Sequence, residues 1–154
     1  MKTIAIMQPT FIPWIGYFSL IDQVDEFIFL DNVQFDKRSW QQRNQIKTQT
    51  GPQWLTIPVV SKGKSNQIIK DVLIKSENKN TIFHKISTTI KYNYHKTDYF
   101  EKYFNSFSEI LIESDLNLST LNQTIIKWLC DCFCINTRFL QASKLDVSGN
   151  RADL

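Results

Sequence analysis

Residues 4–21 read Ile4-Ala-Ile-Met-Gln8-Pro-Thr-Phe-Ile-Pro13-Trp-Ile-Gly16-Tyr-Phe-Ser-Leu-Ile21, and this stretch decides the fold. The apolar run before Gln8 predicts a buried strand, and the amphipathic pattern after Pro13 predicts a helix. Gln8 and Thr10 then lie at the carboxyl end of the strand and face the start of the helix. In open α/β sheets ligands bind in this crevice, where free amide donors and the helix dipole favour phosphate or carboxylate. A strand–turn–helix unit that binds nothing fits the same pattern.

The order of the remaining elements predicts an α/β protein. A second buried strand over 27–30 makes a β-α-β unit, whose right-handed crossover implies a parallel pair. A polar, irregular stretch is expected over 33–50, and Ser119 is the expected N-cap of the last helix. The other expected elements are strands over 54–60, 68–74 and 138–142 and helices over 81–94, 98–112 and 118–134. Together they predict a Rossmann-like mixed sheet with a parallel N-terminal β-α-β unit and a helical second half.

Length and composition are typical of one globular domain spanning residues 1–154. Hydrophobic residues make up 42% of the chain, which is too many for a disordered protein. Apolar runs stay well short of the roughly 20 residues that cross a bilayer, and no secretory signal pattern is present, so we expect a cytoplasmic protein. The net charge of +3 permits an anionic ligand without demanding nucleic acid, whose binders carry a concentrated basic stripe.

Three cysteines stand at alternate positions, Cys130, Cys132 and Cys134. On a helix, Cys130 and Cys134 share a face while Cys132 points elsewhere. No fourth cysteine or nearby histidine completes a tetrahedral zinc site, and the odd count argues against disulfides. We therefore expect structural thiols, with no bound metal.

Acidic, amide and basic residues crowd the polar stretch behind the second strand. Asp31 falls at the carboxyl end of that strand, where a carboxylate can bind a ribose hydroxyl, a metal or a substrate amine, or simply cap a turn. Arg38, Arg43 and Lys47 could clamp a phosphate or carboxylate, for which arginine has the better geometry. A solvated basic loop is the alternative for each of them. Their convergence in one long loop favours a site.

His84, on the first of the three helices, is the better placed of two histidines for acid–base work near neutral pH. A structural role on the helix surface is the alternative. The chain contains no nucleophile elbow, Walker loop or Gly-x-Gly-x-x-Gly fingerprint, and its four glycines could hardly form a phosphate cradle. We expect no cofactor. Phosphate binding would then depend on the helix start near Trp14 and on the basic loop.

Several stretches together closely resemble the WbqC-like protein family. They are Gln8-Pro-Thr-Phe-Ile-Pro-Trp-Ile-Gly-Tyr-Phe, Phe29-Leu-Asp-Asn-Val-Gln-Phe, Lys37-Arg-Ser-Trp-Gln-Gln-Arg-Asn-Gln-Ile-Lys, Trp54-Leu-Thr-Ile-Pro-Val and the His84 helix followed by Tyr99-Phe100. The resemblance implies a context in bacterial O-antigen and other surface-polysaccharide gene clusters. It also implies a longer protein, because family members continue past a segment like Gly149-Asn-Arg151. A looser resemblance to nucleotidylyltransferases places Trp14-Ile-Gly-Tyr17 where those enzymes have His-x-x-His, so only their topology is expected to carry over.

The leading interpretation is a transferase that acts on an activated sugar or on an acyl or aminoacyl donor during surface-polysaccharide biosynthesis. Asp31 and His84 are the candidate catalytic residues. The candidate substrate-binding residues are Gln8, Thr10, Trp14, Tyr17, Gln34, Arg38, Arg43, Asn44 and Lys47. The expected partner is an anionic small molecule: a nucleotide-sugar, a phosphosugar or an acyl-thioester. The alternatives are a non-catalytic module that binds a nucleotide-sugar or a partner protein and, third, nucleic-acid binding through the basic loop.

Overall fold

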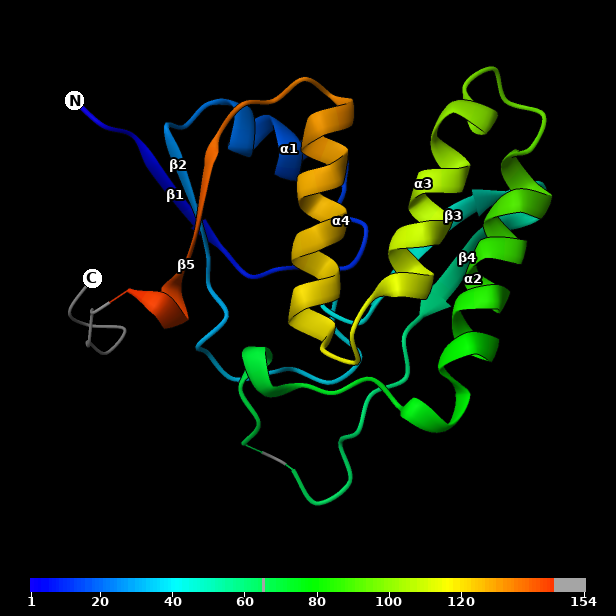
Figure 1. Ribbon diagram of the computed structural model, residues 1–154, viewed down its shortest axis with the longest axis horizontal. Helices are drawn as coiled ribbons and strands as arrows, with labels where there is room; N and C mark the ends of the chain where they lie inside the picture. The colour runs from blue at the N-terminus through cyan, green and yellow to red at the C-terminus, as the bar shows by residue number, and fades with distance from the viewer. Residues whose placement is uncertain (65, 146–154) are drawn as a thin grey trace.

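A three-stranded parallel sheet forms one side of the molecule (Figure 1). The computed structural model describes residues 1–64 and 66–145. Strands β1 (Ile4–Met7), β2 (Glu26–Phe29) and β5 (Arg138–Gln141) lie in the order β1-β2-β5. Ala5 pairs with Phe27, which pairs in turn with Phe139. The predicted α/β class and the parallel N-terminal β-α-β unit are therefore confirmed.

Two helices pack against the same face of this sheet. Helix α1 (Ile15–Asp22) connects β1 to β2, and α4 (Leu118–Cys132) precedes β5. Both connections step in the same direction across the sheet, so right-handed crossovers place both helices on one face. The core there contains Phe27 and Phe29 from β2, whereas alternate β1 residues point away and leave Ile6 half-exposed.

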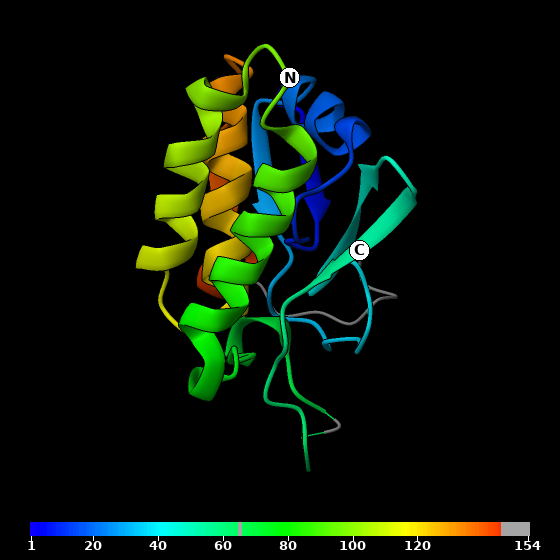
Figure 2. The same cartoon turned by 90° about the vertical axis from the view of Figure 1, so that its right-hand side faces the viewer.

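A second unit packs on the other side of α4. It contains the antiparallel hairpin of β3 (Arg43–Thr48) and β4 (Gly51–Thr56), with α2 (Lys79–Tyr94) and α3 (Phe100–Glu113). Figure 2 shows the hairpin as a separate strip beside the helices. Helix α4 contributes Leu121 and Ile125 to the core of this unit, and Ile126 and Cys130 to the core under the parallel sheet. It therefore joins the two cores.

Several predicted boundaries were wrong. The stretch 33–50, which was expected to be irregular, contains β3. The strand expected over 54–60 is β4, which begins earlier, at Gly51, and ends at Thr56. Residues 68–74 form a 3₁₀ turn (Ile69–Asp71) flanked by isolated bridges, because the chain crosses other segments there without running alongside one. Asn117, not Ser119, caps α4 and accepts a hydrogen bond from the Thr120 amide at 2.9 Å. The segment 149–151 lies outside the described residues.

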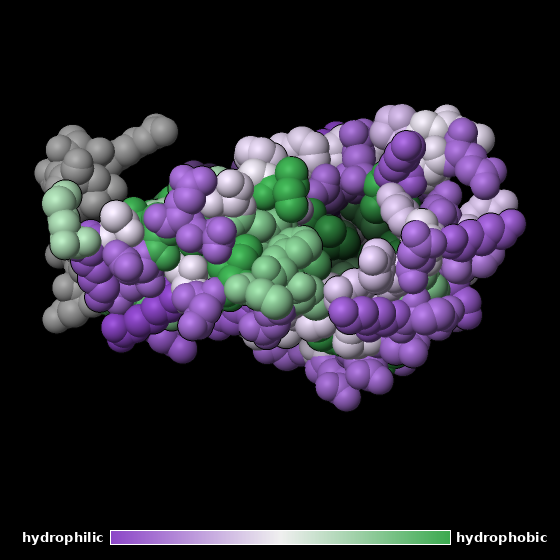
Figure 3. Space-filling model, turned by 90° about the horizontal axis from the view of Figure 1, so that it is seen from above, coloured by the Kyte–Doolittle hydropathy of each residue, from purple (hydrophilic) through white to green (hydrophobic). Residues whose placement is uncertain are grey.

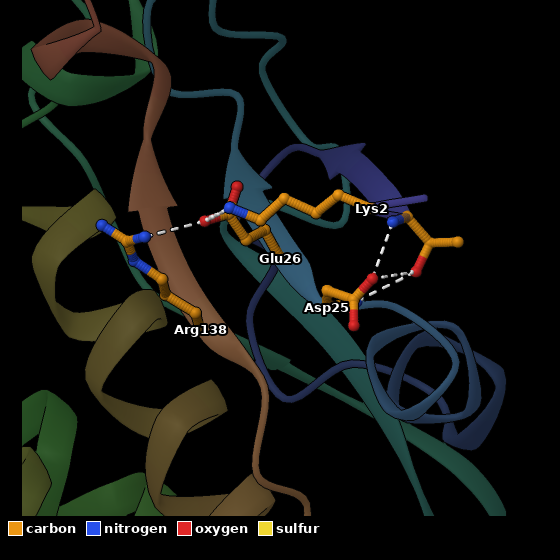
Figure 4. A network of polar contacts seen from close by, with 5 residues as sticks. Lys2, Asp25, Glu26 and Arg138 are labelled. Carbon is orange, nitrogen blue, oxygen red and sulfur yellow. Dashed lines mark hydrogen bonds and ion pairs between the residues drawn. The ribbon is translucent and has the colours of Figure 1, made fainter.

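The amino end of the sheet is held by charged contacts (Figure 4). Glu26 accepts hydrogen bonds from Lys2 at 2.5 Å and Arg138 at 3.0 Å, and so joins all three strands. The hydrogen bond from Lys2 and the nearby charge of Arg138 lower the pKa of Glu26. Asp25 accepts from the backbone amide and hydroxyl of Thr3, and these bonds lower its pKa. The contacts fix where β1 begins.

Candidate functional site

Buried and half-buried amide side chains gather at the carboxyl end of the parallel sheet. We call Gln8, Gln41, Asn122, Gln123 and Gln141 the amide cluster. Gln8 follows β1, Gln141 ends β5, and α4 provides Asn122 and Gln123. Gln41 donates to Gln8 at 2.8 Å, and Gln141 donates to Gln123 at 2.6 Å. The sheet edge predicted to hold the site is thus lined with amides.

Asn122 connects this cluster to the two polar loops. Its Nδ2 donates to the carbonyl of Gln41 at 2.7 Å and to that of Pro9 at 3.2 Å. Its Oδ1 is buried and has no hydrogen-bond partner among the described residues. A buried acceptor left without a donor is costly, so this oxygen is suited to a ligand or water that donates a hydrogen bond.

Asp31 does lie at the carboxyl end of β2, but its carboxylate is already engaged. One oxygen accepts from the Ser143 amide at 2.9 Å, and the other accepts from the Ser143 hydroxyl at 2.7 Å. Only 2% of the residue is exposed, and its backbone carbonyl accepts from the Lys70 amide. In this arrangement Asp31 ties the end of β2 to the turn that follows β5.

His84 lies elsewhere. Its side chain is exposed on α2, where Nε2 is 3.4 Å from the hydroxyl of Thr88 on the same helix. In Figure 1, α2 lies on the opposite side of α4 from the parallel sheet. The structure therefore does not bring His84 to Asp31, and the two predicted catalytic residues do not form one site.

The loop and helix after β1 carry three of the predicted substrate-binding residues, which differ in how far they are exposed. Tyr17 is buried and donates its hydroxyl to the Gln8 carbonyl at 3.0 Å, and burial raises its pKa. Thr10 is half-buried, whereas Trp14 is 68% exposed just before α1. The Trp14 ring lies against Gly16, where a Cβ atom would be 1.7 Å from it. Tyr17 is thus a scaffold residue, while Trp14 is accessible to a ligand.

The outer face of the hairpin holds Arg43 in a fixed position. Its guanidinium carbon lies 4.3 Å from the centre of the Trp54 ring. The ring centres of Trp40 and Trp54 are 5.6 Å apart. Both tryptophans are substantially exposed, at 42% for Trp54 and 55% for Trp40. Because strand side chains alternate, Lys47 shares this face with Arg43. We call these four residues the Arg43–Trp54 face.

Arg43 has no partner for its charge in the described chain. Its Nε is buried without a hydrogen-bond partner, and the ion pairs found within residues 1–64 and 66–145 all involve Glu26. Arg38 lies in the preceding turn, where its amide donates to Gln42 and its side chain is exposed. The hairpin therefore presents a guanidinium that is positioned but not neutralised.

Asn44 and Gln34 have mainly structural contacts. Asn44 lies on the inner face of β3 and donates from Nδ2 to the carbonyls of Phe11 and Ile12. Gln34 is exposed and pairs with Ile68 across an isolated bridge. The sequence analysis missed Ser143, most of the amide cluster and the two tryptophans. Only the tryptophans gave a signal, as large aromatics in or beside a polar loop.

Comparison with known proteins identifies the family. The sequence profile of the WbqC-like protein family matches residues 8–154. The chain belongs to the WbqC-like protein family. It is also 36% identical over 155 residues to the uncharacterized protein Rv1507c of Mycobacterium tuberculosis, in an alignment that covers 99% of this chain and 65% of that protein. The chain thus spans less than two thirds of the length of this relative. No solved structure matches the chain.

Metal-binding and membrane-spanning features are not found in the described part of this WbqC-like chain. Residues 1–64 and 66–145 contain no group of three or more histidine, cysteine or acidic side chains that could hold a metal ion. None of their helices is both long and apolar enough to cross a membrane. Cys130 is buried in α4, and this burial raises its pKa to about 11. Cys134 follows the end of α4 and is exposed, so the two thiols do not share a helix face.

Proposed function

We propose that this WbqC-like chain binds the anionic part of an activated donor and serves a transferase reaction in surface-polysaccharide biosynthesis. The observation that supports it is the Arg43 guanidinium, stacked on Trp54 without a counter-charge in the described chain. Arginine keeps its charge at any physiological pH, and its planar fork matches the paired oxygens of a phosphate or carboxylate. Stacking restricts the side chain before the ligand arrives, which reduces the entropy lost on binding.

The proposed donor would extend across the outer face of the hairpin. Arg43 would bind its anionic group, with Arg38 and Lys47 adding positive charge from the neighbouring turn and strand. Preorganised charge of this kind also stabilises a leaving group as negative charge develops on it. In the absence of a nucleophile motif, we propose direct transfer from donor to acceptor. Gln8, Thr10 and the start of α1 remain proposed contacts for the rest of the substrate.

A binding module without catalysis is the second candidate function. It is favoured by the engagement of Asp31 with Ser143 and by the exposed position of His84 on α2, where its side chain hydrogen-bonds only with the Thr88 hydroxyl of the same helix among the described residues. Among the described residues, neither side chain is hydrogen-bonded to a member of the Arg43–Trp54 face. Both candidates require anion binding, and only the transferase requires turnover. Nucleic acid ranks third, and steeply salt-dependent binding to a single strand would promote it.

Titration calorimetry with nucleotide-sugars, phosphosugars and acyl-thioesters tests the proposal on three proteins. The wild type should bind at least one class, and Arg43→Lys should weaken that binding by about 1–3 kcal/mol because the fork is lost while the charge is kept. Arg138→Lys is the matched control, since Arg138 pairs with Glu26 at the other end of the sheet. Equal affinity in all three proteins would remove Arg43 from the site.

A further inference from the structure

A hollow with apolar walls opens between the second and third helices, away from the Asp31 end of the sheet. Its volume is about 370 Å³, and α2, α3, α4 and β3 surround it. Ile46, Ile90, Phe104, Trp128 and Leu129 form much of its wall. Figure 3, seen from above, shows hydrophobic surface inside this depression, with hydrophilic surface to its right and further hydrophobic surface to its left. Small-molecule pockets generally measure about 300–1,000 Å³ and have such walls.

The polar side-chain groups of the residues that line the hollow are hydroxyls and the indole N–H of Trp128. Tyr94, Thr97, Tyr99 and Tyr103 line it, and no charged side chain of the described residues does. The Tyr94 oxygen accepts a hydrogen bond from the Lys47 amide at 3.1 Å, which fixes the phenol and leaves its proton free to donate. An uncharged carbonyl suits these donors, whereas a carboxylate would meet no opposite charge among them.

One wall of the hollow is formed by a strained residue. Ile12 has a φ of +46°, a conformation that costs a β-branched residue about 1–2 kcal/mol. Asn44 holds it there by donating to the carbonyls of Phe11 and Ile12. Such strain persists where the surroundings maintain it, and it is concentrated at functional sites. The consequence here is that the loop after β1 places an isoleucine against the hollow.

We propose that the hollow binds the acyl chain of an ester or thioester donor, with its uncharged carbonyl at the Tyr94 hydroxyl. An apolar cavity of about 150 Å³ accepts benzene, so this hollow has room for a chain of roughly ten carbon atoms. The concave shape and the absence of charged side chains among the described lining residues favour this ligand over a flat protein partner. The proposal rests on the proposed function for its biological role, because it assigns the donor to the acyl class.

Calorimetry with S-decanoyl-N-acetylcysteamine tests the hollow directly, with sodium decanoate and N-acetylcysteamine as comparison ligands. The thioester should bind, the carboxylate should bind about tenfold more weakly, and N-acetylcysteamine alone should not bind. Ile90→Trp fills the hollow and should reduce thioester affinity by about tenfold or more. Thr97 lines the hollow from an exposed loop position, so Thr97→Trp should block the opening of the hollow. This variant provides the same test if Ile90→Trp does not fold.

The tyrosines provide a matched pair. Tyr94→Phe removes the hydroxyl proposed to bind the carbonyl, together with its bond to the exposed Lys47 amide, and should weaken thioester binding several-fold. Tyr92 lies on the same helix, is 78% exposed and does not line the hollow, so Tyr92→Phe should leave binding unchanged. Equal binding of thioester and decanoate, or binding that survives a filled hollow, would overturn the proposal. So would a dimer, seen by sedimentation, that Ile90→Trp dissociates. Retained thioester binding in Arg43→Lys would separate this site from the Arg43–Trp54 face.

Discussion

Asn44→Ala should lower the free energy of unfolding by about 0–3 kcal/mol, with a central value of about 1.5 kcal/mol. The substitution removes three hydrogen bonds: the two that Nδ2 donates to the carbonyls of Phe11 and Ile12, and the one that Oδ1 accepts from the Gln45 amide. The two donated bonds are worth about 1 kcal/mol each, whereas the exposed Gln45 amide can bond to water instead. Phe11 is fully buried, so leaving its carbonyl unpaired raises the loss to about 2–4 kcal/mol. Relaxation of Ile12 from its left-handed conformation returns about 1–2 kcal/mol. For a chain of this length, the net loss lowers the melting temperature by up to roughly 10 °C.

Two further variants test the reasoning behind that value. Asn44→Asp keeps the shape but supplies only acceptors, so it should destabilise at least as much as alanine. Ile12→Gly should be close to neutral in the wild type, because relief of strain offsets the lost side-chain contacts. In the Asn44→Ala background, where the loop is already relaxed, the same change should destabilise. Urea unfolding followed by circular dichroism gives all four values, and a coupling energy near zero would refute the strain argument.

Three other predictions concern separate parts of the molecule. Because the pKa of Glu26 is lowered in the folded protein, its carboxylate should stabilise the fold above about pH 4.3, and this stabilisation should be lost as the pH falls through the folded-state pKa. Between pH 7 and pH 3, the urea concentration at half-unfolding should therefore decrease less for Glu26→Gln than for the wild type. Because burial raises the pKa of Cys130 to about 11, iodoacetamide at pH 8 should label the exposed Cys134 well before Cys130 in a timed reaction. Labelling of both thiols at the same rate would contradict the burial of Cys130. His84→Ala should leave stability within about 0.5 kcal/mol, whereas Asp31→Ala should lower it by about 2–4 kcal/mol; the reverse order would contradict their placement.

The parallel sheet could be predicted because its signals are local. Each strand is a short apolar run, and the helix between β1 and β2 settles their relative direction through the handedness of the crossover. The β3–β4 hairpin gave no comparable signal. On its inner face, Asn44 and Thr48 flank a single apolar residue, Ile46, so β3 reads as a polar loop. Its pairing with β4 is visible only once the register is known.

The candidate site was predicted only in part, because some of its contacts depend on long-range pairing that no local pattern indicates. Arg43 was found from its chemistry, but its stacking on Trp54 depends on the hairpin register. The bond between Asn122 and the Pro9 carbonyl joins residues 113 positions apart, which no local pattern indicates. The helix that carries His84 was predicted, whereas its distance from the sheet follows from the way α4 separates the two cores.

The loop between β1 and α1 connects both proposed ligand regions, and this explains why a short stretch dominates the sequence. Gln8 joins the amide cluster, Phe11 enters the second core, and Ile12 forms a wall of the hollow. Asn44 holds the loop from the inner face of β3, while Arg43, its neighbour on the same strand, stacks on the outer face. A change at Asn44 should therefore disturb the hollow more than the Arg43–Trp54 face, since only the hollow depends on the conformation of Ile12. In Asn44→Ala, weaker thioester binding with unchanged binding at Arg43 would be the expected result, and equal losses at both would indicate that the strand itself had moved.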